Sequence, residues 1–171
     1  VRRAGGYGAA VAAFALAVNL VVYQSAVLPQ VTSFTAGREH SMVRWGRWFG
    51  EHTTENVTIA TPDIGALGYY SQRRVLDLGG LVTPRMIPLL RHAPQEDVLA
   101  RLAFSEFARP EFVVDRADSA YDLMRRSPWA ACLQPIGRAE LPNLGIARPG
   151  RVTYTFYRVD WRRFDELRRL P

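Results

Sequence analysis

The stretch from Ile59 to Pro84, IATPDIGALGYYSQRRVLDLGGLVTP, decides the fold. An apolar run over residues 57–60 stops at Pro62 and is followed by Gly65 and Gly68, which predicts a buried strand entering a tight glycine turn that carries Asp63. Tyr69 and Tyr70 form a pair of adjacent aromatic residues after this turn. A second apolar run over 75–78 ends in Gly79-Gly80 and predicts a second strand with Asp77 at its end. We therefore expect two adjacent strands with acidic ends.

The segment that follows predicts the fold class. Pro94 begins a helix with acidic residues in its first turn, and this helix is expected to end at Arg109-Pro110. The apolar run Phe112–Val114 is typical of a central strand that is covered on both faces. Strand, helix and strand in this order predict an α/β fold, a three-layer domain with a largely parallel sheet flanked by helices.

The C-terminal third predicts an irregular segment, one strand and one helix. Residues 127–150 hold four prolines and several glycines, so we expect irregular structure with a short strand near Cys132. Residues 151–159 alternate in polarity, which indicates a strand half exposed at the periphery of the sheet. Asp160 is expected to cap a final helix over 161–170.

The N-terminal segment has no charged residue from Ala4 to Gly37. Its most apolar part, Tyr7–Leu28, would span about 33 Å as a helix, which is enough to cross the hydrocarbon core of a bilayer. A membrane helix, a cleaved signal peptide and a buried core helix all fit this composition. We predict a transmembrane helix over 1–30, followed by an α/β domain over 31–171.

The basic residues Arg2 and Arg3 precede this helix and favour a cytoplasmic N-terminal end. We therefore expect residues after about 30 to lie on the extracytoplasmic side of the membrane. The segment 38–51 is amphipathic, with Met42, Trp45 and Phe49 on one face. This pattern fits a helix that covers the sheet, and it also fits a basic helix lying on the membrane surface.

Composition limits the other function classes. The chain starts at Val1 rather than Met, so we expect it to be part of a longer protein. All 22 basic residues are arginines and the net charge is +6, yet arginine and acidic residues alternate from Arg38 onward, so we expect no nucleic-acid partner. Cys132 is the single cysteine, and no Cys/His spacing indicates a metal site.

Asp63 and Asp77 are the candidate functional residues, because ligands collect at the carboxyl ends of strands in open α/β sheets. Two carboxylates there could serve as acid and base on a glycosidic bond or hold a divalent ion. The alternative is that Asp63 makes an Asx-type turn and that Asp77 accepts hydrogen bonds from backbone amides of the Gly79-Gly80 loop. The segment 65–68 favours tight packing over phosphate binding, since it lacks the GxGxxG form.

These residues together resemble a known family. An apolar span, a tryptophan-bearing helix, the 59–84 stretch, a PEFVV strand and a closing TFYRVDW are similar to the C-terminal extracytoplasmic domain of bacterial polytopic glycosyltransferases of the GT-C superfamily. These are relatives of protein mannosyltransferases and lipid A aminoarabinose transferases. The most specific part is D-x-G-x-x-x-Y-Y followed by R-x-x-D-x-x-G-L, which is formed here by Asp63, Gly65, Tyr69, Tyr70, Arg74, Asp77, Gly80 and Leu81.

The resemblance implies that the parent protein transfers a sugar from a polyprenyl-phosphate carrier to an extracytoplasmic acceptor. It places the catalytic aspartate in a loop outside this chain, so no catalytic residue, metal ligand or cofactor is expected here; a divalent metal would belong to the parent. Asp63, Tyr70, Arg74 and Asp77 are expected to shape the acceptor side, while Gly65, Gly68, Gly80 and Leu81 serve as structural motif residues. The expected partners are membrane lipid and, through the parent, the lipid-linked sugar donor. A single-span extracytoplasmic binding module is the alternative from another class.

Overall fold

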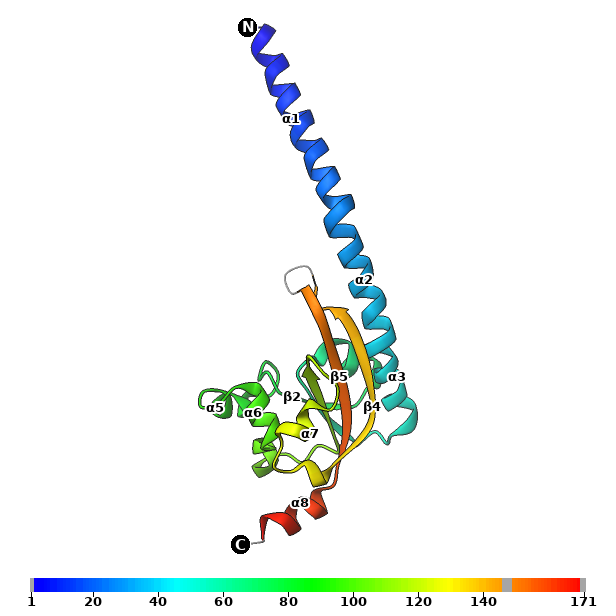
Figure 1. Ribbon diagram of the computed structural model, residues 1–171, viewed down its shortest axis with the longest axis vertical. Coiled ribbons are helices and arrows are strands. Elements are labelled where there is room, and N and C mark those ends of the chain that lie inside the picture. The colour runs from blue at the N-terminus through cyan, green and yellow to red at the C-terminus, as the bar shows by residue number, and fades with distance from the viewer. Residues whose placement is uncertain (1, 146–148, 170–171) are drawn as a thin grey trace.

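The computed structural model describes residues 2–145 and 149–169, with side chains from Gly6 onward among the N-terminal residues. It begins with one long helix that extends well beyond the rest of the molecule (Figure 1). The helix comprises α1 (Arg2–Val22), α2 (Leu28–Arg38) and α3 (Arg44–His52), joined by π-helical turns at Tyr23–Val27 and Glu39–Val43. The side chains of Arg2 and Arg3, on which the predicted orientation rests, lie outside the described part.

The first π-helical turn has a local cause in Pro29. Proline has no N–H to donate to the carbonyl four residues earlier, and its ring crowds that carbonyl, so the preceding turn widens instead of breaking. The helix therefore stays continuous through residue 38. The expected separate amphipathic helix at 38–51 is instead the last part of the same helix, and it packs on the sheet.

The exposed part of this helix is long and apolar enough to cross a membrane. The apolar stretch of this helix lies wholly outside the folded domain. A signal sequence near an N-terminus has the same features. The helix is therefore not a buried core helix over this part. Partial burial of the helix begins at Val27 and Gln30, and the Ser33 hydroxyl accepts a hydrogen bond from Asn143 of the domain.

The domain is built on a five-stranded mixed sheet in the order β2-β1-β3-β5-β4. The strands are β1 (Thr58–Thr61), β2 (Arg74–Asp77), β3 (Phe112–Ala117), β4 (Leu133–Asn143) and β5 (Pro149–Val159). β1 runs parallel to β2 and β3, whereas β5 is antiparallel to both β3 and β4. The α/β prediction is confirmed, but the sheet is mixed rather than largely parallel.

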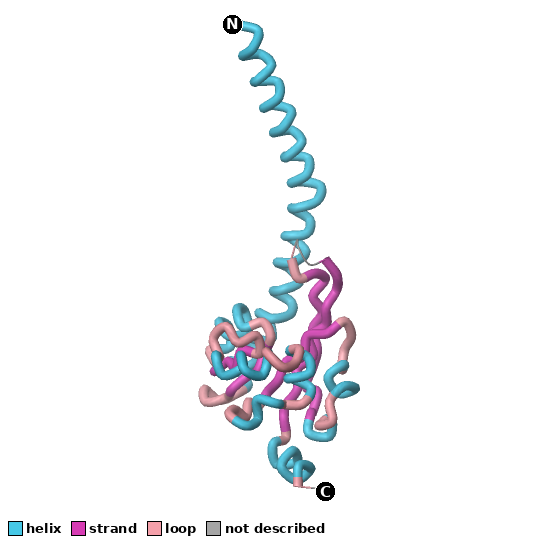
Figure 2. The backbone as a smooth tube through the Cα atoms, turned by 90° about the vertical axis from the view of Figure 1, so that its left-hand side faces the viewer, coloured by secondary structure: helices cyan, strands magenta, loops and turns pink. Residues whose placement is uncertain are grey.

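Apolar residues cover both faces of the sheet, because neighbouring strand residues point to opposite sides. Phe49 of α3 and Leu67 of α4 (Ile64–Ser71) pack on one face with Phe156. The short helices α5 (Ile87–Leu90), α6 (Gln95–Ala100), α7 (Asp122–Arg126) and α8 (Trp161–Arg168) lie against the other face, which includes Tyr157. Figure 2 shows the helical segments gathered around the strands below the long helix.

Three local expectations are wrong. The predicted glycine turn after β1 is the helix α4, which carries Tyr69 and Tyr70. The helix expected to run from Pro94 to Arg109 ends at Ala100, and Leu102 then adopts a left-handed backbone with φ of 49°. β5 is an inner strand whose residues 153–157 are buried, not a half-exposed peripheral strand.

The predicted irregular segment 127–150 mostly forms β4. Pro135 and Pro142 concealed this strand from sequence analysis because proline cannot donate to a sheet ladder, but β4 is an edge strand with register shifts beside both prolines. The predicted cap of the last helix is confirmed, since Asp160 Oδ1 accepts a hydrogen bond from the Arg163 amide at 2.9 Å.

Candidate functional site

Asp63 lies where β1 passes into α4, and its carboxylate joins side chains from two other strands. Arg116 of β3 and Tyr154 of β5 are direct cross-strand partners, so their side chains stand together on one face of the sheet. Arg116 Nη1 donates to Asp63 Oδ1 at 3.0 Å and to Oδ2 at 2.9 Å. Tyr154 Oη donates to Asp63 Oδ2 at 2.7 Å. The predicted Asx-type turn is therefore not the role of this carboxylate.

Electrostatics keep the two partners of Asp63, Tyr154 and Arg116, in their protonated forms. Burial raises the pKa of Tyr154, and the neighbouring Asp63 carboxylate raises it further, so the phenol remains a hydrogen-bond donor. Burial lowers the pKa of the Arg116 guanidinium, but Asp63 and Tyr154 outweigh this effect and its pKa is raised overall. Asp63 consequently faces two permanent donors. Its side chain is still 38% exposed, and Oδ1 accepts only one of these bonds, which leaves capacity for a further donor.

Asp77 has a different environment at the end of β2. It is 1% exposed, and its carboxylate accepts hydrogen bonds from the amides of Gly79 at 2.8 Å and Val82 at 2.9 Å. The Thr83 hydroxyl accepts from the Asp77 amide at 3.0 Å. The structural alternative for Asp77 is confirmed: its carboxylate fixes the loop that follows β2.

A cavity of about 340 Å³ lies beside these two aspartates, and we call it the Asp63 cavity. Its walls come from the long helix, the ends of β1 and β2, and the β4–β5 hairpin. The residues lining it are Phe34, Arg38, Met42, Pro62, Asp63, Ile64, Gly65, Ala66, Asp77, Gly79, Leu81, Leu141, Leu144 and Tyr154. The walls are mainly apolar, and polar groups meet at Arg38 and Asp63. Because Asp77 is almost fully buried and its two oxygens hold amides of its own loop, we assign it to supporting this wall.

A second cavity of about 480 Å³, the Tyr69 cavity, adjoins the first between the long helix and α4. Phe34, Arg38, Gly65 and Ala66 line both cavities, which together we call the groove. Among the described residues, the Arg38 side chain makes no hydrogen bond or ion pair; its guanidinium lies 5.5 Å from the centre of the Phe34 ring. A cation without a counter-ion therefore stands where the two halves of the groove meet.

The structure places the predicted binding residues unevenly. Tyr70 lines the Tyr69 cavity and its ring lies 5.1 Å from the Arg47 guanidinium, so it belongs to the groove together with Asp63. Arg74 is the first residue of β2, whereas Asp77 is its last, so Arg74 lies at the opposite end of the strand from the groove. The structure does not bring Arg74 to the groove.

The structural motif residues have distinct roles. A β-carbon on Gly68 would lie 3.2 Å from Val75 Cγ2, so this glycine lets α4 pack closely on β2, as the packing interpretation predicts. Gly80 has a φ of +80° in the loop fixed by Asp77. Leu81 follows it and is 85% exposed at the rim of the Asp63 cavity. A β-carbon on Gly65 would face the Arg38 side chain at 4.0 Å.

The sequence patterns did not identify Arg116, Tyr154 and Arg38 as candidate residues. Arg116 and Tyr154 approach Asp63 only through pairing of β3 with β5, across 53 and 91 residues of sequence. The available signal was their polarity within strands, since Arg116 follows an apolar run and Asp115, and Tyr154 stands in an alternating segment. Arg38 was identifiable as the first charged residue after the apolar segment.

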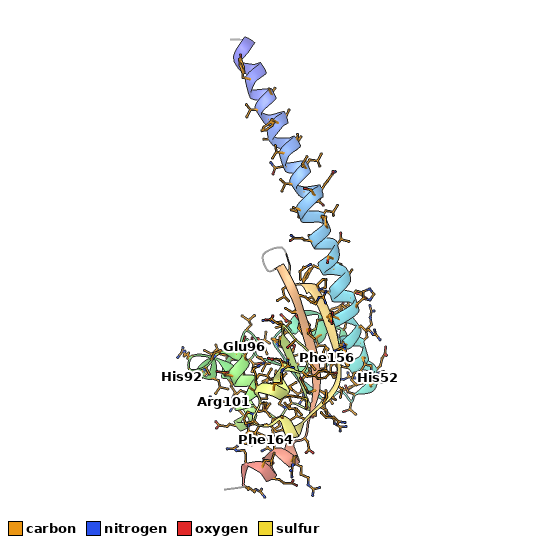
Figure 3. The ribbon with its side chains drawn as sticks, viewed as in Figure 1. His52, His92, Glu96, Arg101, Phe156 and Phe164 are labelled. Carbon is orange, nitrogen blue, oxygen red and sulfur yellow. The ribbon has the colours of Figure 1, made fainter. Side chains whose placement is uncertain are left out.

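No metal site is evident in the part of the chain that the structure describes, where no three His, Cys, Asp or Glu side chains are grouped to hold an ion. The labelled histidines in Figure 3 illustrate the separation: His52 lies at the end of the long helix and His92 on the other side of the domain. Cys132 is buried, and burial raises the pKa of its thiol.

A sequence family described as "Domain of unknown function (DUF8728)" matches residues 30–161. This match covers most of the chain, and the chain belongs to that family. Neither the curated proteins nor the solved structures contain a significant match.

Proposed function

We propose that this member of the DUF8728 family is the non-catalytic, extracytoplasmic C-terminal domain of a membrane glycosyltransferase, in which the groove positions a hydroxyl-bearing acceptor beside the membrane. The parent enzyme would transfer a sugar from a polyprenyl-phosphate carrier. The observation that carries this proposal is the place of the groove. Its walls include the helix that leaves the domain as the candidate membrane anchor.

Distances along the helix support this placement. Ser33, whose hydroxyl accepts from Asn143 at 3.4 Å, follows Leu28 by five residues. At about 1.5 Å per residue, the hairpin meets the helix about 8 Å beyond Leu28, and Arg38 follows at about 15 Å. The polar layers on either side of the hydrocarbon core are each about 5–8 Å thick. A groove at this level opens just outside the lipid headgroups, where an acceptor would meet a carrier-linked sugar.

The chemistry of the groove suits an acceptor hydroxyl. Asp63 keeps an unused acceptor position, and Tyr154 and Arg116 hold the carboxylate in one orientation. Tyr69 and Tyr70 contact each other edge to face at 5.1 Å between ring centres and supply an aromatic wall. Because the carboxylate is already paired with a guanidinium, we assign Asp63 to binding and no residue of this chain to catalysis.

The test uses the complete reading frame that encodes this chain, expressed in membranes. Transfer of a labelled sugar from polyprenyl phosphate is measured for the parent protein and for Asp63→Asn. We expect the acceptor KM to rise about tenfold, roughly the 1.4 kcal/mol of one hydrogen bond to a charged group, with a smaller change in kcat. Glu55→Ala, an exposed acid outside the groove, is the matched control.

The alternative function is a single-span extracytoplasmic binding module, favoured by the one helix of the described residues that is long and apolar enough to cross a membrane. It predicts a reading frame with one apolar span and ligand binding without carrier lipid. Membranes that hold the full protein and show no sugar transfer would contradict the glycosyltransferase proposal and support this one.

A further inference from the structure

A third cavity, separate from the groove, lies between the long helix and the edge strand β4. Its volume is about 280 Å³, and its lining residues are His40, Arg44, Trp45, Trp48, Arg138 and Ala139. None of them lines the groove. We call it the tryptophan cavity.

The helix geometry explains why these side chains gather. His40, Arg44 and Trp48 are spaced four residues apart and therefore share one face of the helix. Trp45 is held against the sheet, stacked on Phe156 with 4.1 Å between ring centres and 16° between ring planes. Gly137 of β4 makes room for this ring, because a β-carbon there would clash with the Trp45 indole.

The second indole is also fixed in place. Trp48 lies 5.3 Å from Trp45 between ring centres, and the His52 ring stacks on it at 4.9 Å and 9°. His52 is itself held through a hydrogen-bond contact of Nδ1 with the Trp48 carbonyl at 2.9 Å. Both tryptophans are only half-buried, so the cavity has an aromatic wall whose orientation is set before any ligand arrives.

The positive charge of this cavity is not neutralised by any acidic side chain that the structure describes. Arg44 and Arg138 form no ion pair with any residue that the structure describes. The acidic residues closest to them in sequence form ion pairs with other arginines: Glu39 pairs with Arg47 at 2.9 Å, and Glu140 pairs with Arg151 at 3.5 Å. Two guanidinium groups therefore face a small aromatic pocket without a carboxylate to neutralise them.

We propose that the tryptophan cavity binds an anionic saccharide, with one sugar ring against the indoles and its charged group on Arg44 and Arg138. The C–H face of a sugar ring is an apolar surface that packs on indole, which offers a large rigid contact area. Guanidinium groups bind carboxylate and phosphate oxygens through paired hydrogen bonds. The volume lies just below the range of drug-sized sites, which matches a single ring better than a peptide segment.

The experiment follows tryptophan fluorescence of the full chain in detergent micelles during titration. The probes are trigalacturonate and glucose 6-phosphate, with the neutral oligosaccharide maltotriose and free glucose as their uncharged counterparts. We expect saturable quenching by at least one charged probe and at least tenfold weaker binding of its neutral counterpart. The stronger of the two charged probes identifies the group, carboxylate or phosphate, that the arginines accept.

Variants assign this binding to the cavity. Arg44→Gln and Arg138→Gln should each weaken binding at least fivefold, and Trp48→Phe should remove most of the quenching. Arg91→Gln, an exposed arginine elsewhere in the domain, is the matched control and should bind as the wild type does. Arg44 and Arg138 are exposed, so their variants should keep the wild-type melting temperature, and each serves as a check on the other.

Several results would overturn the proposal. Equal binding of neutral and charged sugars would show that the arginines do not contribute to binding. Binding of triglutamate or inorganic phosphate as strong as that of the charged sugars would show that the sugar ring does not contribute. Absence of quenching, or weakening of binding by Arg91→Gln as large as that by the cavity variants, would show that the tryptophan cavity is not a binding site.

Discussion

Two aspartates stand at the ends of neighbouring parallel strands in this protein, yet they have different chemical roles. Asp63 is partly exposed and is held by an arginine and a tyrosine from distant strands. Asp77 is buried and is held by two amides of its own loop. The difference arises from the chain that follows each residue. Asp63 precedes a helix, whereas Asp77 precedes a glycine loop whose free amides turn back on the carboxylate.

We predict that Asp77→Ala lowers the free energy of unfolding by about 1–3 kcal/mol, because two amide donors in the loop lose their acceptor. Chemical denaturation of the full chain in detergent measures this change. The exposed Glu55→Ala should stay within about 0.5 kcal/mol of the wild type. If Asp77→Ala melts as the wild type does but its parent protein loses sugar transfer, then Asp77 acts on the substrate and the structural role is wrong.

At the scale of elements, the long helix approaches α4 very closely because small residues line their contact. A β-carbon on Gly46 would lie 2.8 Å from Tyr70 Cβ and 3.2 Å from the Leu67 carbonyl oxygen. Gly50, one turn later, faces the carbonyl oxygen of Ser71 at 3.3 Å. This contact holds α4 against the helix, and α4 carries the tyrosines of the groove. The position of the groove wall thus depends on residues that do not line it.

We predict that Gly46→Ala destabilises the domain by about 1–3 kcal/mol, although alanine favours a helix over glycine by about 1 kcal/mol. The clash outweighs the propensity because the neighbouring atoms belong to backbone and a β-carbon, which cannot rotate away. Thermal melting checks the prediction. Gly8→Ala meets nothing within 4 Å and should not lower the melting temperature. Equal effects of the two variants would show that helix packing at Gly46 is unimportant.

The elements also show what sequence patterns could predict. β1, β2, β3 and the capped helix α8 follow from apolar runs and turn residues, because their signals are local. α4 was missed because Gly65, Gly68 and two tyrosines are weak helix formers, and packing against the long helix overrides that preference. β4 was missed because its prolines are acceptable only at an edge, and edge position is a property of the whole sheet.

The residues of the candidate site also differ in whether local sequence signals could predict them. Asp63 and Asp77 were identifiable because strand ends and glycines mark them in one segment. Arg116 and Tyr154 were not, since their approach to Asp63 depends on which strands pair. The mixed sheet has the same origin: β5 returns antiparallel through the hairpin with β4, and nothing within residues 151–159 specifies its direction.

For the whole molecule, the decisive question is what surrounds the exposed part of the long helix. From Gly6 to Ala26 every side chain is exposed, and the segment contains no charge. Leaving this surface in water is unfavourable by about 25 cal/mol per Å² of apolar area, whereas a bilayer removes it from water without any protein partner. A signal peptide would be removed after export, so the two interpretations differ in the mass of the mature protein.

We predict that the exported protein retains this helix as an anchor. Intact-mass measurement of protein purified from membranes should show that the helix is still present, and alkaline carbonate should fail to extract it. In a protein made of residues 1–171 alone, pairing Val11→Arg with Leu16→Arg places two charges in the span, at about 2.5–3.5 kcal/mol each near the bilayer centre, and should release the protein or prevent its insertion. The same double change at exposed positions of the domain, Glu55→Arg with Gln134→Arg, should leave it in the membrane. A soluble product that begins after residue 25 would identify a cleaved signal sequence and would separate the groove from the membrane surface on which its proposed function depends.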